Sequence, residues 1–326
     1  MKAVVFTKYG PPDVLSYEEV EKPVPGDNDV LVKVHAACIN DWDWGNLRGK
    51  PFINRMIFGL FRPKRSNILG CDMAGRVEKV GANVKKFKEG DEVFGDLSNS
   101  GFATFAEYVS APENALVPKS PSMTFKQAAA LPQAGALAVQ GLRDKGQVKK
   151  GQRVLINGAG GGVGTLGVQI AKLAGAEVTC VDAKEKLDLL TSLGADHVID
   201  YKKVDYTKTG KQYDLILDNV VTRSMFSYKR TLRPGGRLLM IGGDIPRIIR
   251  IALTAPLISG RKKLGILGLR PNVGLDYLNE LFEAGKLKIM IDRTYKLKEV
   301  PEAFRFFGTA KHKGKIVITV VPDKKS

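Results

Sequence analysis

The sequence predicts an α/β protein with two parts, a β-rich domain and a domain built on a doubly wound parallel sheet. First, residues 1–124 contain short β segments separated by turn sequences. Second, helical and apolar segments alternate from about residue 125 onward, which is typical of a parallel sheet with crossover helices. Third, a glycine-rich turn at 157–164 lies between an expected strand and an expected helix. At 326 residues the chain is long enough for two hydrophobic cores.

Within residues 1–124, four segments combine β-branched and apolar residues as strands do. Glycine, proline, aspartate and asparagine form the turns between them, at 10–12, 25–28 and 88–91. The expected strands are residues 2–7, 30–36, 74–80 and 103–109. We expect them to form a compact, irregular β-rich domain.

The second part begins with an alanine-rich helix expected over residues 125–142. Short apolar strands then alternate with helical segments of crossover length, so the sheet should be parallel. The expected strands are residues 153–157, 177–181, 215–217, 237–241 and 264–269.

The end of the chain returns to the first domain in this interpretation. A helix expected over 275–283 precedes a last strand at 315–321, and no crossover helix follows that strand. The first domain therefore comprises residues 1–124 and 271–326, and the second comprises residues 125–270.

The composition is that of an ordinary globular protein, with 44% hydrophobic and 26% charged residues. No segment approaches the roughly eighteen uninterrupted apolar residues of a bilayer-spanning helix, which excludes an integral membrane protein of that kind. Cys38, Cys71 and Cys180 lie far apart, and the first seven residues turn polar too soon for a secretory signal. We therefore expect a reducing, cytoplasmic setting.

The 51 Lys and Arg residues exceed the 34 Asp and Glu residues and give a net charge of +17. Such a charge attracts anions, among them nucleic acids, anionic lipids and phosphorylated cofactors. The basic residues are spread along the chain. The sequence therefore favours a lysine-rich solvated surface with one anion pocket over a nucleic-acid or membrane role.

The most specific motif is the glycine turn, whose sequence from residue 157 to residue 164 is NGAGGGVG. Glycines let the backbone approach a dinucleotide pyrophosphate, and the N-terminus of the following helix offers free N–H groups. The literal G-x-G-x-x-G pattern falls at Gly162, Gly164 and Gly167, but a register of Ala159, Gly161 and Gly164 places the glycines between strand and helix. Asp182 ends the next strand, as expected of a dinucleotide-binding domain.

The residues alone leave the choice of dinucleotide open. Asp182 favours NADH, because its carboxylate accepts the ribose hydroxyls and repels a 2′-phosphate. Lys184 and Lys186 lie just beyond it and can pair with that phosphate, while Tyr201 ends the next strand. Both lysines can also be ordinary solvated residues of a helix face.

Twelve further segments, in order along the chain, match sequence patterns of a known protein family: 2–5, 9–15, 40–43, 70–75, 90–95, 101–108, 128–132, 160–164, 193–196, 199–201, 235–237 and 314–317. On the basis of these segments, the chain resembles the zinc-free, quinone-oxidoreductase-like branch of the medium-chain dehydrogenase/reductase superfamily. The resemblance implies a GroES-like catalytic domain and a Rossmann dinucleotide-binding domain. It also implies an NAD(P)H-dependent oxidoreductase that transfers hydride to quinones or α,β-unsaturated carbonyl compounds.

The resemblance also bears on zinc. The zinc alcohol dehydrogenases of this superfamily place zinc ligands where this chain has Asn40, Cys71-Asp72 and a position near Ala134. Asn40 and Ala134 do not bind zinc, so the resemblance implies an enzyme without catalytic zinc. A displaced site of Cys38, Cys71 and Asp72 is the alternative, and three cysteines are too few for the family's four-cysteine structural zinc. Without a metal, we expect substrates that are already activated toward hydride.

By the same resemblance, Asn40 donates a hydrogen bond to the substrate oxygen, and Asp43 is a catalytic-site acid that orients its neighbours. Trp42 and Trp44 are expected as apolar walls for a flat substrate. The alternatives are a capping role for Asn40 and core packing for the tryptophans. The expected cofactor contacts are Gly160, Gly161, Gly162, Val163, Gly164, Asp182, Lys186, Tyr201 and Gly242.

Lys186 and Tyr201 match positions that hold the 2′-phosphate of NADPH in quinone-reductase relatives, which favours NADPH over NADH. Asp182 replaces a small residue there. Leu137 and Val221 also depart from the family pattern, near the expected nicotinamide and ribose.

The segment 245–263 combines apolar residues with five basic residues and no acid. A lid or subunit interface is favoured for it over peripheral contact with an anionic membrane. The resemblance implies a homodimer, and no nucleic-acid partner is expected. The alternative functions are a zinc-dependent alcohol dehydrogenase and a non-catalytic protein that binds NAD(P)H or nucleic acid.

Overall fold

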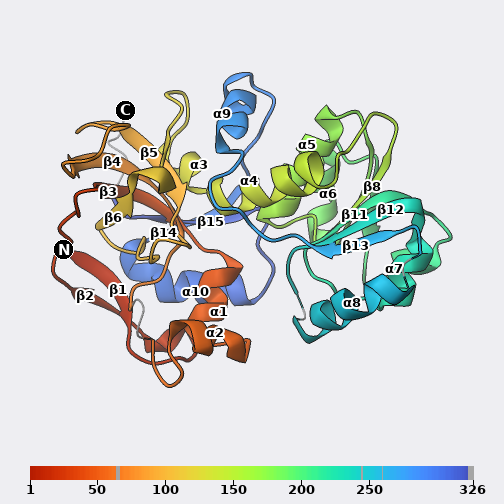
Figure 1. The fold of residues 1–326 in the computed structure, drawn as a ribbon, viewed down its shortest axis with the longest axis horizontal. Coiled ribbons are helices and arrows are strands. Elements are labelled where there is room, and N and C mark those ends of the chain that lie inside the picture. Colours follow the sequence, from red (N-terminus) through yellow and green to blue (C-terminus); the bar gives the residue numbers. More distant parts are fainter. Residues whose placement is uncertain (64–66, 244, 259, 322–326) are drawn as a thin grey trace. The chain divides into compact units, whose positions relative to one another are not determined.

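The computed structural model describes residues 1–63, 67–243, 245–258 and 260–321. The chain divides into two compact units (Figure 1). Unit 1 comprises Met1–Gln133, Pro271–Gly285 and Ile291–Ser326, and unit 2 comprises Ala134–Arg270 and Lys286–Met290. The boundary after residue 133 lies later in the chain than the expected boundary after residue 124.

The shift in the boundary has a local cause. The helix expected over 125–142 is interrupted, giving α3 (Phe125–Ala129), α4 (Pro132–Val139) and a π-helical turn (Gln140–Asp144). Proline has no backbone N–H and suits only the first turn of a helix, so a new helix begins at Pro132. The Phe125 ring of α3 stacks on His35 with ring centroids 4.1 Å apart, which holds α3 in unit 1.

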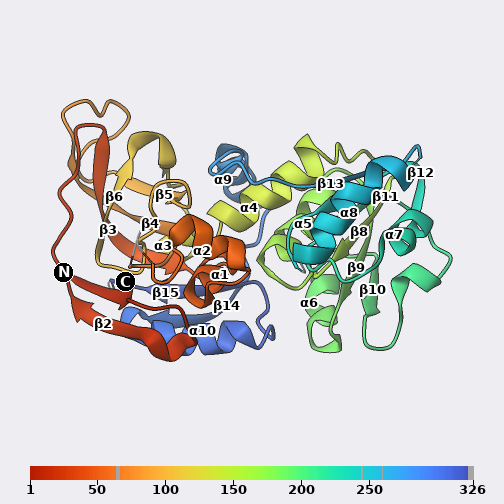
Figure 2. The ribbon, with the colours of Figure 1, turned by 60° about the horizontal axis from the view of Figure 1, so that its bottom comes forward.

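Unit 1 is built on a seven-stranded sheet of order β14-β15-β3-β4-β5-β7, with β6 paired to β3 (Figure 2). Its strands are β3 (Asp29–Cys38), β4 (Asp72–Val80), β5 (Glu92–Asp96), β6 (Tyr108–Pro112), β7 (Val117–Pro118), β14 (Ile291–Lys296) and β15 (Lys315–Thr319). Strands β1 (Lys2–Phe6) and β2 (Leu15–Glu19) form a separate antiparallel pair. Since β15 pairs with β3, the last predicted strand does return to the first domain.

The strand expected over 103–109 begins later, at Tyr108. Phe102 and Ala103 have φ values of +66° and +72°, a left-handed conformation that a strand cannot contain. The chain therefore bends before it joins the sheet as β6.

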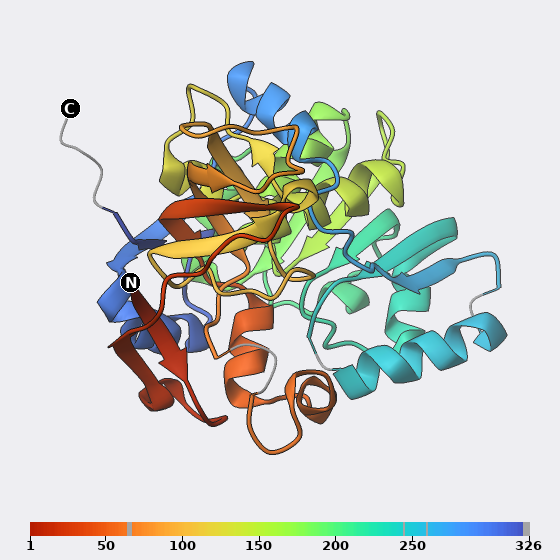
Figure 3. The same cartoon turned by 60° about the vertical axis from the view of Figure 1, so that its left-hand side comes forward.

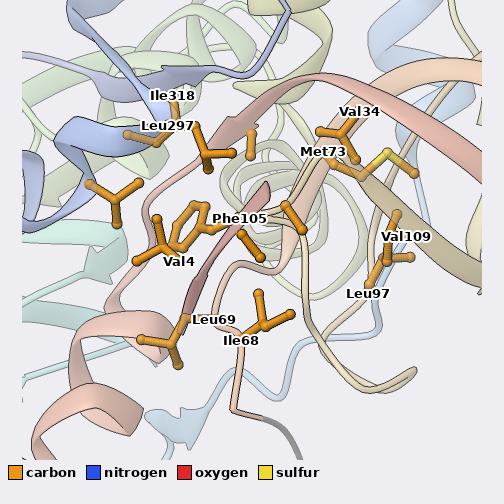
Figure 4. Close-up of a cluster of buried hydrophobic side chains, with 14 of the residues drawn as sticks. Val4, Val34, Ile68, Leu69, Met73, Leu97, Phe105, Val109, Leu297 and Ile318 are labelled. Atoms are coloured by element: carbon orange, nitrogen blue, oxygen red, sulfur yellow. The ribbon is translucent and has the colours of Figure 1, made fainter. Parts of the chain in front are cut away.

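The core of unit 1 lies between the sheet, the β1–β2 pair and helix α10 (Val300–Gly308). Figure 4 shows Phe105 beside Val4, and the backbone N–H of Val4 donates to the carbonyl of Phe105. Besides α3, the unit also contains α1 (Asp41–Arg48), α2 (Phe52–Phe58) and α9 (Leu275–Glu283). Helix α9 has the predicted bounds, whereas α1, α2 and α10 were not predicted.

Unit 2 contains a six-stranded sheet of order β10-β9-β8-β11-β12-β13 in which every pair is parallel. Its strands are β8 (Arg153–Asn157), β9 (Glu177–Asp182), β10 (His197–Asp200), β11 (Tyr213–Asp218), β12 (Leu232–Met240) and β13 (Lys263–Ile266). Figure 1 shows α5 (Gly162–Leu173) and α6 (Leu187–Ser192) on one side of the sheet, with α7 (Met225–Thr231) and α8 (Ile245–Ile258) on the other. The predicted doubly wound parallel sheet is confirmed.

Most of the segment 245–263 forms helix α8, cyan in Figure 3, and leads to β13; residue 259 lies outside the described residues. Ile248 and Ile251 are buried in the core of unit 2, whereas Ile249 and Leu253 are 51% and 72% exposed. Helix α8 therefore packs one face on the sheet, as crossover helices do. A role of its exposed face as a lid, a subunit interface or a membrane contact stays a prediction. No helix within the described residues has the length and apolar character to cross a membrane.

Candidate functional site

The glycine turn lies between the end of β8 and the start of α5, as predicted. A Cβ on Gly164 would lie 2.3 Å from the carbonyl oxygen of Ala159, so only glycine fits there. A Cβ on Gly167 would make only ordinary contacts of 3.4 Å or more. The register of Ala159, Gly161 and Gly164 therefore fits the structure better than the literal pattern. The literal pattern places its last glycine at Gly167, where a side chain could be accommodated.

The turn offers the features that a diphosphate needs. Gly161 is the N-cap of α5, and Gly162, Val163 and Gly164 form the first turn of this 12-residue helix. The first N–H groups of an α-helix lack intrahelical acceptors and carry the positive end of the helix dipole. Backbone without side chains can thus approach an anionic group closely at this point.

Four of the predicted cofactor residues meet beside this turn. The Asp182 carboxylate accepts hydrogen bonds from the N–H of Gly160 at 2.7 Å and of Ala183 at 2.8 Å. The Lys186 ammonium lies 3.7 Å from the same carboxylate, and both side chains are buried. The backbone N–H of Tyr201 donates to the Asp182 carbonyl at 3.1 Å, while the Tyr201 side chain is 49% exposed.

Gly242 lies at the same edge of the sheet, after the end of β12. A Cβ on Gly242 would lie 3.1 Å from the carbonyl oxygen of Asn219, which follows β11. Asn219 donates to the carbonyl of Asn157, and its own buried Oδ1 has no donor among the described residues. This edge contains the point between β8 and β11 where the strand order reverses, which is where open parallel sheets bind their ligands.

Val221, which the resemblance singles out as a departure from the family pattern, has a φ of +40°. Its N–H donates to the buried Asp218 carboxylate at 2.7 Å, which holds this loop in place. The sequence did not single out Asp218 or Asn219, because their contacts depend on how β8 and β11 pair.

A second cluster of polar residues lies in unit 1, where α1 begins. Asn40 is the N-cap of α1, and its backbone N–H donates to Asp43 Oδ2 at 2.9 Å. Asp43 Oδ1 accepts from the N–H of Gly70 at 2.9 Å and from the thiol of Cys71 at 3.4 Å. Asp43 is fully buried, so its carboxylate ties the start of α1 to the segment that leads into β4.

The centre of this cluster is Lys315, which the sequence analysis missed as a site residue. Its ammonium donates to Asn40 Oδ1 at 2.5 Å and to the Ile39 carbonyl at 3.4 Å, and lies 3.5 Å from Asp72 Oδ2. Asp72 Oδ1 also accepts from the backbone N–H of Gln133 at 3.1 Å. Lys315 begins β15, so only the pairing of β15 with β3 brings it to these residues.

Burial governs the titration of the cluster. It raises the pKa of Asp43 and that of Asp72 to about 7. Burial by itself lowers the pKa of Lys315, but the neighbouring Cys38, Asp72 and Asp43 raise it, and the net shift is upward. Lys315 therefore remains an ammonium ion at neutral pH.

The residues at the family's zinc-ligand positions do not fit a zinc ion. The Cys71 thiol is bonded to Asp43, and the Lys315 cation stands beside Asp72, where a second cation would be repelled. The Cys38 thiol is also engaged, because it donates to the Ile316 carbonyl at 3.1 Å. Within the described ranges, no three His, Cys, Asp or Glu side chains are grouped to hold a metal.

The two tryptophans differ in their surroundings. Trp44 lies against Phe304 and Phe307 of α10, each with ring centroids 6.2 Å away, and the Arg48 guanidinium carbon lies 4.2 Å from the centroid of the Trp44 ring. These contacts correspond to the core-packing alternative. Trp42 is 42% exposed. A role for either one in substrate binding stays a prediction.

Asn40 provides the chemistry that this cluster can offer a substrate. Its side chain is 6% exposed, and its Nδ2 has no acceptor among the described residues. A buried donor without a partner costs about 1–3 kcal/mol, and a bound oxygen atom would satisfy it. The amide can donate a hydrogen bond to an oxygen on which negative charge develops.

Two family models match the chain. The alcohol dehydrogenase GroES-like domain matches residues 26–121, and the zinc-binding dehydrogenase model matches residues 193–318. The quinone-oxidoreductase QR1 of Triphysaria versicolor is 34% identical, with 98% of each chain covered. The NADPH-dependent alkenal/one oxidoreductase of Arabidopsis thaliana is 32% identical, over 99% of this chain and 80% of that protein. The solved quinone oxidoreductase of Coxiella burnetii is similar over 98% of this chain and 99% of its own, with a TM-score of 0.90 and 31% identity.

Proposed function

Because the chain belongs to the medium-chain dehydrogenase/reductase superfamily, in its quinone-oxidoreductase-like branch, we propose that it reduces quinones or α,β-unsaturated carbonyl compounds with NAD(P)H. The observation that carries the proposal is the unpartnered Nδ2 of buried Asn40. Quinones and enones both have an oxygen that becomes negatively charged when hydride is added, and this donor is suited to it. The substrates named for the relatives above belong to the same two classes.

The reduced nicotinamide, when bound, supplies the hydride. The backbone N–H groups of Gly162, Val163 and Gly164, in the first turn of α5, would hold the diphosphate, and Asp182, Lys186 and Tyr201 would bind the adenosine ribose. Asn40 binds and orients the substrate oxygen, and Asp43 holds the backbone of Asn40 in place. Solvent water protonates the product anion.

The reaction proceeds without zinc in this proposal, which is supported by the Lys315 cation at the position beside Asp72. The test measures oxidation of NADPH and NADH by purified protein with quinones, enones and simple alcohols. We expect turnover with a quinone or an enone that a zinc chelator does not reduce. Activity confined to simple alcohols and restored by added zinc would instead support the zinc-dependent alcohol dehydrogenase alternative.

NADPH is the preferred dinucleotide in this proposal. The Lys186 ammonium is close enough to Asp182 to offset the charge that would repel a 2′-phosphate. Lys186→Gln should raise the KM for NADPH by about tenfold or more, as the loss of a charge-assisted hydrogen bond predicts. The KM for NADH should change little. Lys184→Gln, at an exposed position, is the control, and an equal loss with both dinucleotides would argue against a 2′-phosphate contact.

A further inference from the structure

The side chain of Lys315 is buried among oxygen atoms that come from distant parts of unit 1. It is 6% exposed, and its ammonium reaches the carbonyl of Ile39, the amide oxygen of Asn40 and the carboxylate of Asp72. An ammonium group carries three donors and no acceptor. The short contact to Asn40, at 2.5 Å, therefore requires an oxygen on that side of the amide.

This contact determines which end of the Asn40 amide is free. The two ends of an asparagine amide have nearly the same shape, and only hydrogen bonding distinguishes them. Lys315 binds Oδ1, so Nδ2 is the donor end of the amide. No described acceptor meets full hydrogen-bond geometry with Nδ2, and the Asp72 carboxylate is close enough for Asn40 to lower its pKa, so one of the two N–H bonds of Nδ2 stays available. In the opposite orientation, Nδ2 would face a cation and Oδ1 would face the substrate oxygen, which is also an acceptor.

The charge on Lys315 also affects the strength of the donor. A cation bonded to an amide oxygen withdraws electron density from the amide nitrogen, and hydrogen bonds in such a chain strengthen one another. This strengthening of the Nδ2–H hydrogen bond is largest when the acceptor is an anion. Because the substrate oxygen becomes negatively charged in the transition state, the stronger hydrogen bond stabilises the transition state more than the bound substrate.

We propose that Lys315 is a positioning residue of the reduction, which orients and polarises the Asn40 amide so that Nδ2 binds the substrate oxygen. The inference rests on the proposed function, since the substrate oxygen is the acceptor. Asp43 holds the backbone of the same asparagine, so the two charged residues control different parts of Asn40.

Lys315→Met tests the role of the charge, with turnover of the full-length enzyme measured on a quinone and on an enone. Loss of one oriented donor costs about 10²–10³-fold in kcat, and loss of its orientation alone should cost about tenfold or more. The KM for NADPH should stay unchanged, and Lys315→Arg should restore most of kcat. An unaltered kcat in the methionine variant would overturn the proposal.

Lys119→Met is the matched control, because Lys119 is another buried lysine of unit 1, paired with Glu92 at 2.9 Å. It should lower the melting temperature without lowering kcat. If Lys315→Met fails to fold, the double variant Lys315→Met/Asp72→Asn removes both charges and leaves no unpaired carboxylate. The same fall in kcat is expected of it, and a wild-type kcat in a folded double variant would also refute the role.

A double-mutant cycle with Asn40→Ala distinguishes positioning from a general structural effect. If Lys315 acts through Asn40, then Lys315→Met should cause no further fall in kcat once Asn40 is alanine. Additive losses would show that Lys315 acts independently of Asn40 and would overturn the proposal. A wild-type enzyme inactive on every quinone and enone would overturn the proposed function itself, whereas an active wild type with an unaffected Lys315→Met variant would overturn only the role of Lys315.

Discussion

Asn40, Asp43 and Lys315 show what could and could not be predicted at the scale of single residues. The sequence resemblance predicted Asn40 and Asp43, and the structure places them in one hydrogen-bonded cluster. Lys315 stands in the matching segment 314–317, but its contacts to Asn40 and Asp72 join residues that are far apart in the chain. No spacing rule connects such residues, so only the fold could bring them together.

Asp43 gives a prediction about pH. Burial raises its pKa to about 7 from an ordinary value of 3.8, so between these values the folded protein holds a proton that the unfolded chain has released. The stability that this group contributes is therefore complete at low pH and is lost as the pH rises toward 7. We expect Asp43→Asn to weaken the decline in melting temperature between pH 4 and pH 7, as measured by circular dichroism.

The control for this measurement is Asp188→Asn, since Asp188 is exposed on α6. That variant should retain the wild-type pH dependence. If Asp43→Asn and Asp188→Asn gave the same slope as the wild type, burial of the Asp43 carboxyl would not control this part of the stability curve.

At the scale of elements, five strands of unit 2 were predictable from apolar segments of strand length bounded by turn residues. Strand β10 was expected only as the strand that Tyr201 ends, and β12 begins five residues before its expected start. The β8 strand and helix α9 even have their predicted bounds. Helices α1 and α2, of eight and seven residues, were not predicted, since helices this short depend on tertiary contacts rather than on their own propensity. Helix α10 was also not predicted, although α9 of the same nine-residue length was. The break before Pro132 was also missed, although proline is a sequence signal for a helix start.

The glycine turn gives a prediction with a control inside the same helix. Gly164→Ala should destabilise the protein by about 1–3 kcal/mol, because its Cβ would overlap the Ala159 carbonyl. It should also weaken dinucleotide binding, since the turn must shift to admit a methyl group. Gly167→Ala should be neutral or slightly stabilising, because its Cβ would make only contacts of 3.4 Å or more and alanine favours helices.

Urea unfolding and calorimetric titration with NADPH measure both effects. Equal behaviour of the two variants would mean that close packing at Gly164 does not shape the turn.

At the scale of the whole molecule, the net charge of +17 extends well beyond the dinucleotide site. The dinucleotide site accounts for only a few of the basic residues, and the others are spread through both units. The cytoplasmic setting, the homodimer and the absence of a nucleic-acid partner stay predictions.

We expect RNA to bind non-specifically at low salt and to be released by about 0.2 M salt, because dispersed charges give affinity without sequence recognition. Fluorescence anisotropy with two unrelated RNA sequences over a salt series measures this. Tight binding to one sequence that persists at that salt concentration would favour the nucleic-acid-binding alternative.

The position of β15 between β14 and β3 determines the order in which the two units can fold during translation. The ribosome synthesises β3 early, but its neighbour β15 leaves the exit tunnel only after residue 319 has been translated. The six strands of unit 2 are complete long before that, so this unit can fold on the nascent chain. Assembly of the Asn40 cluster must wait for Lys315, and thus for a strand that is translated after all six strands of unit 2.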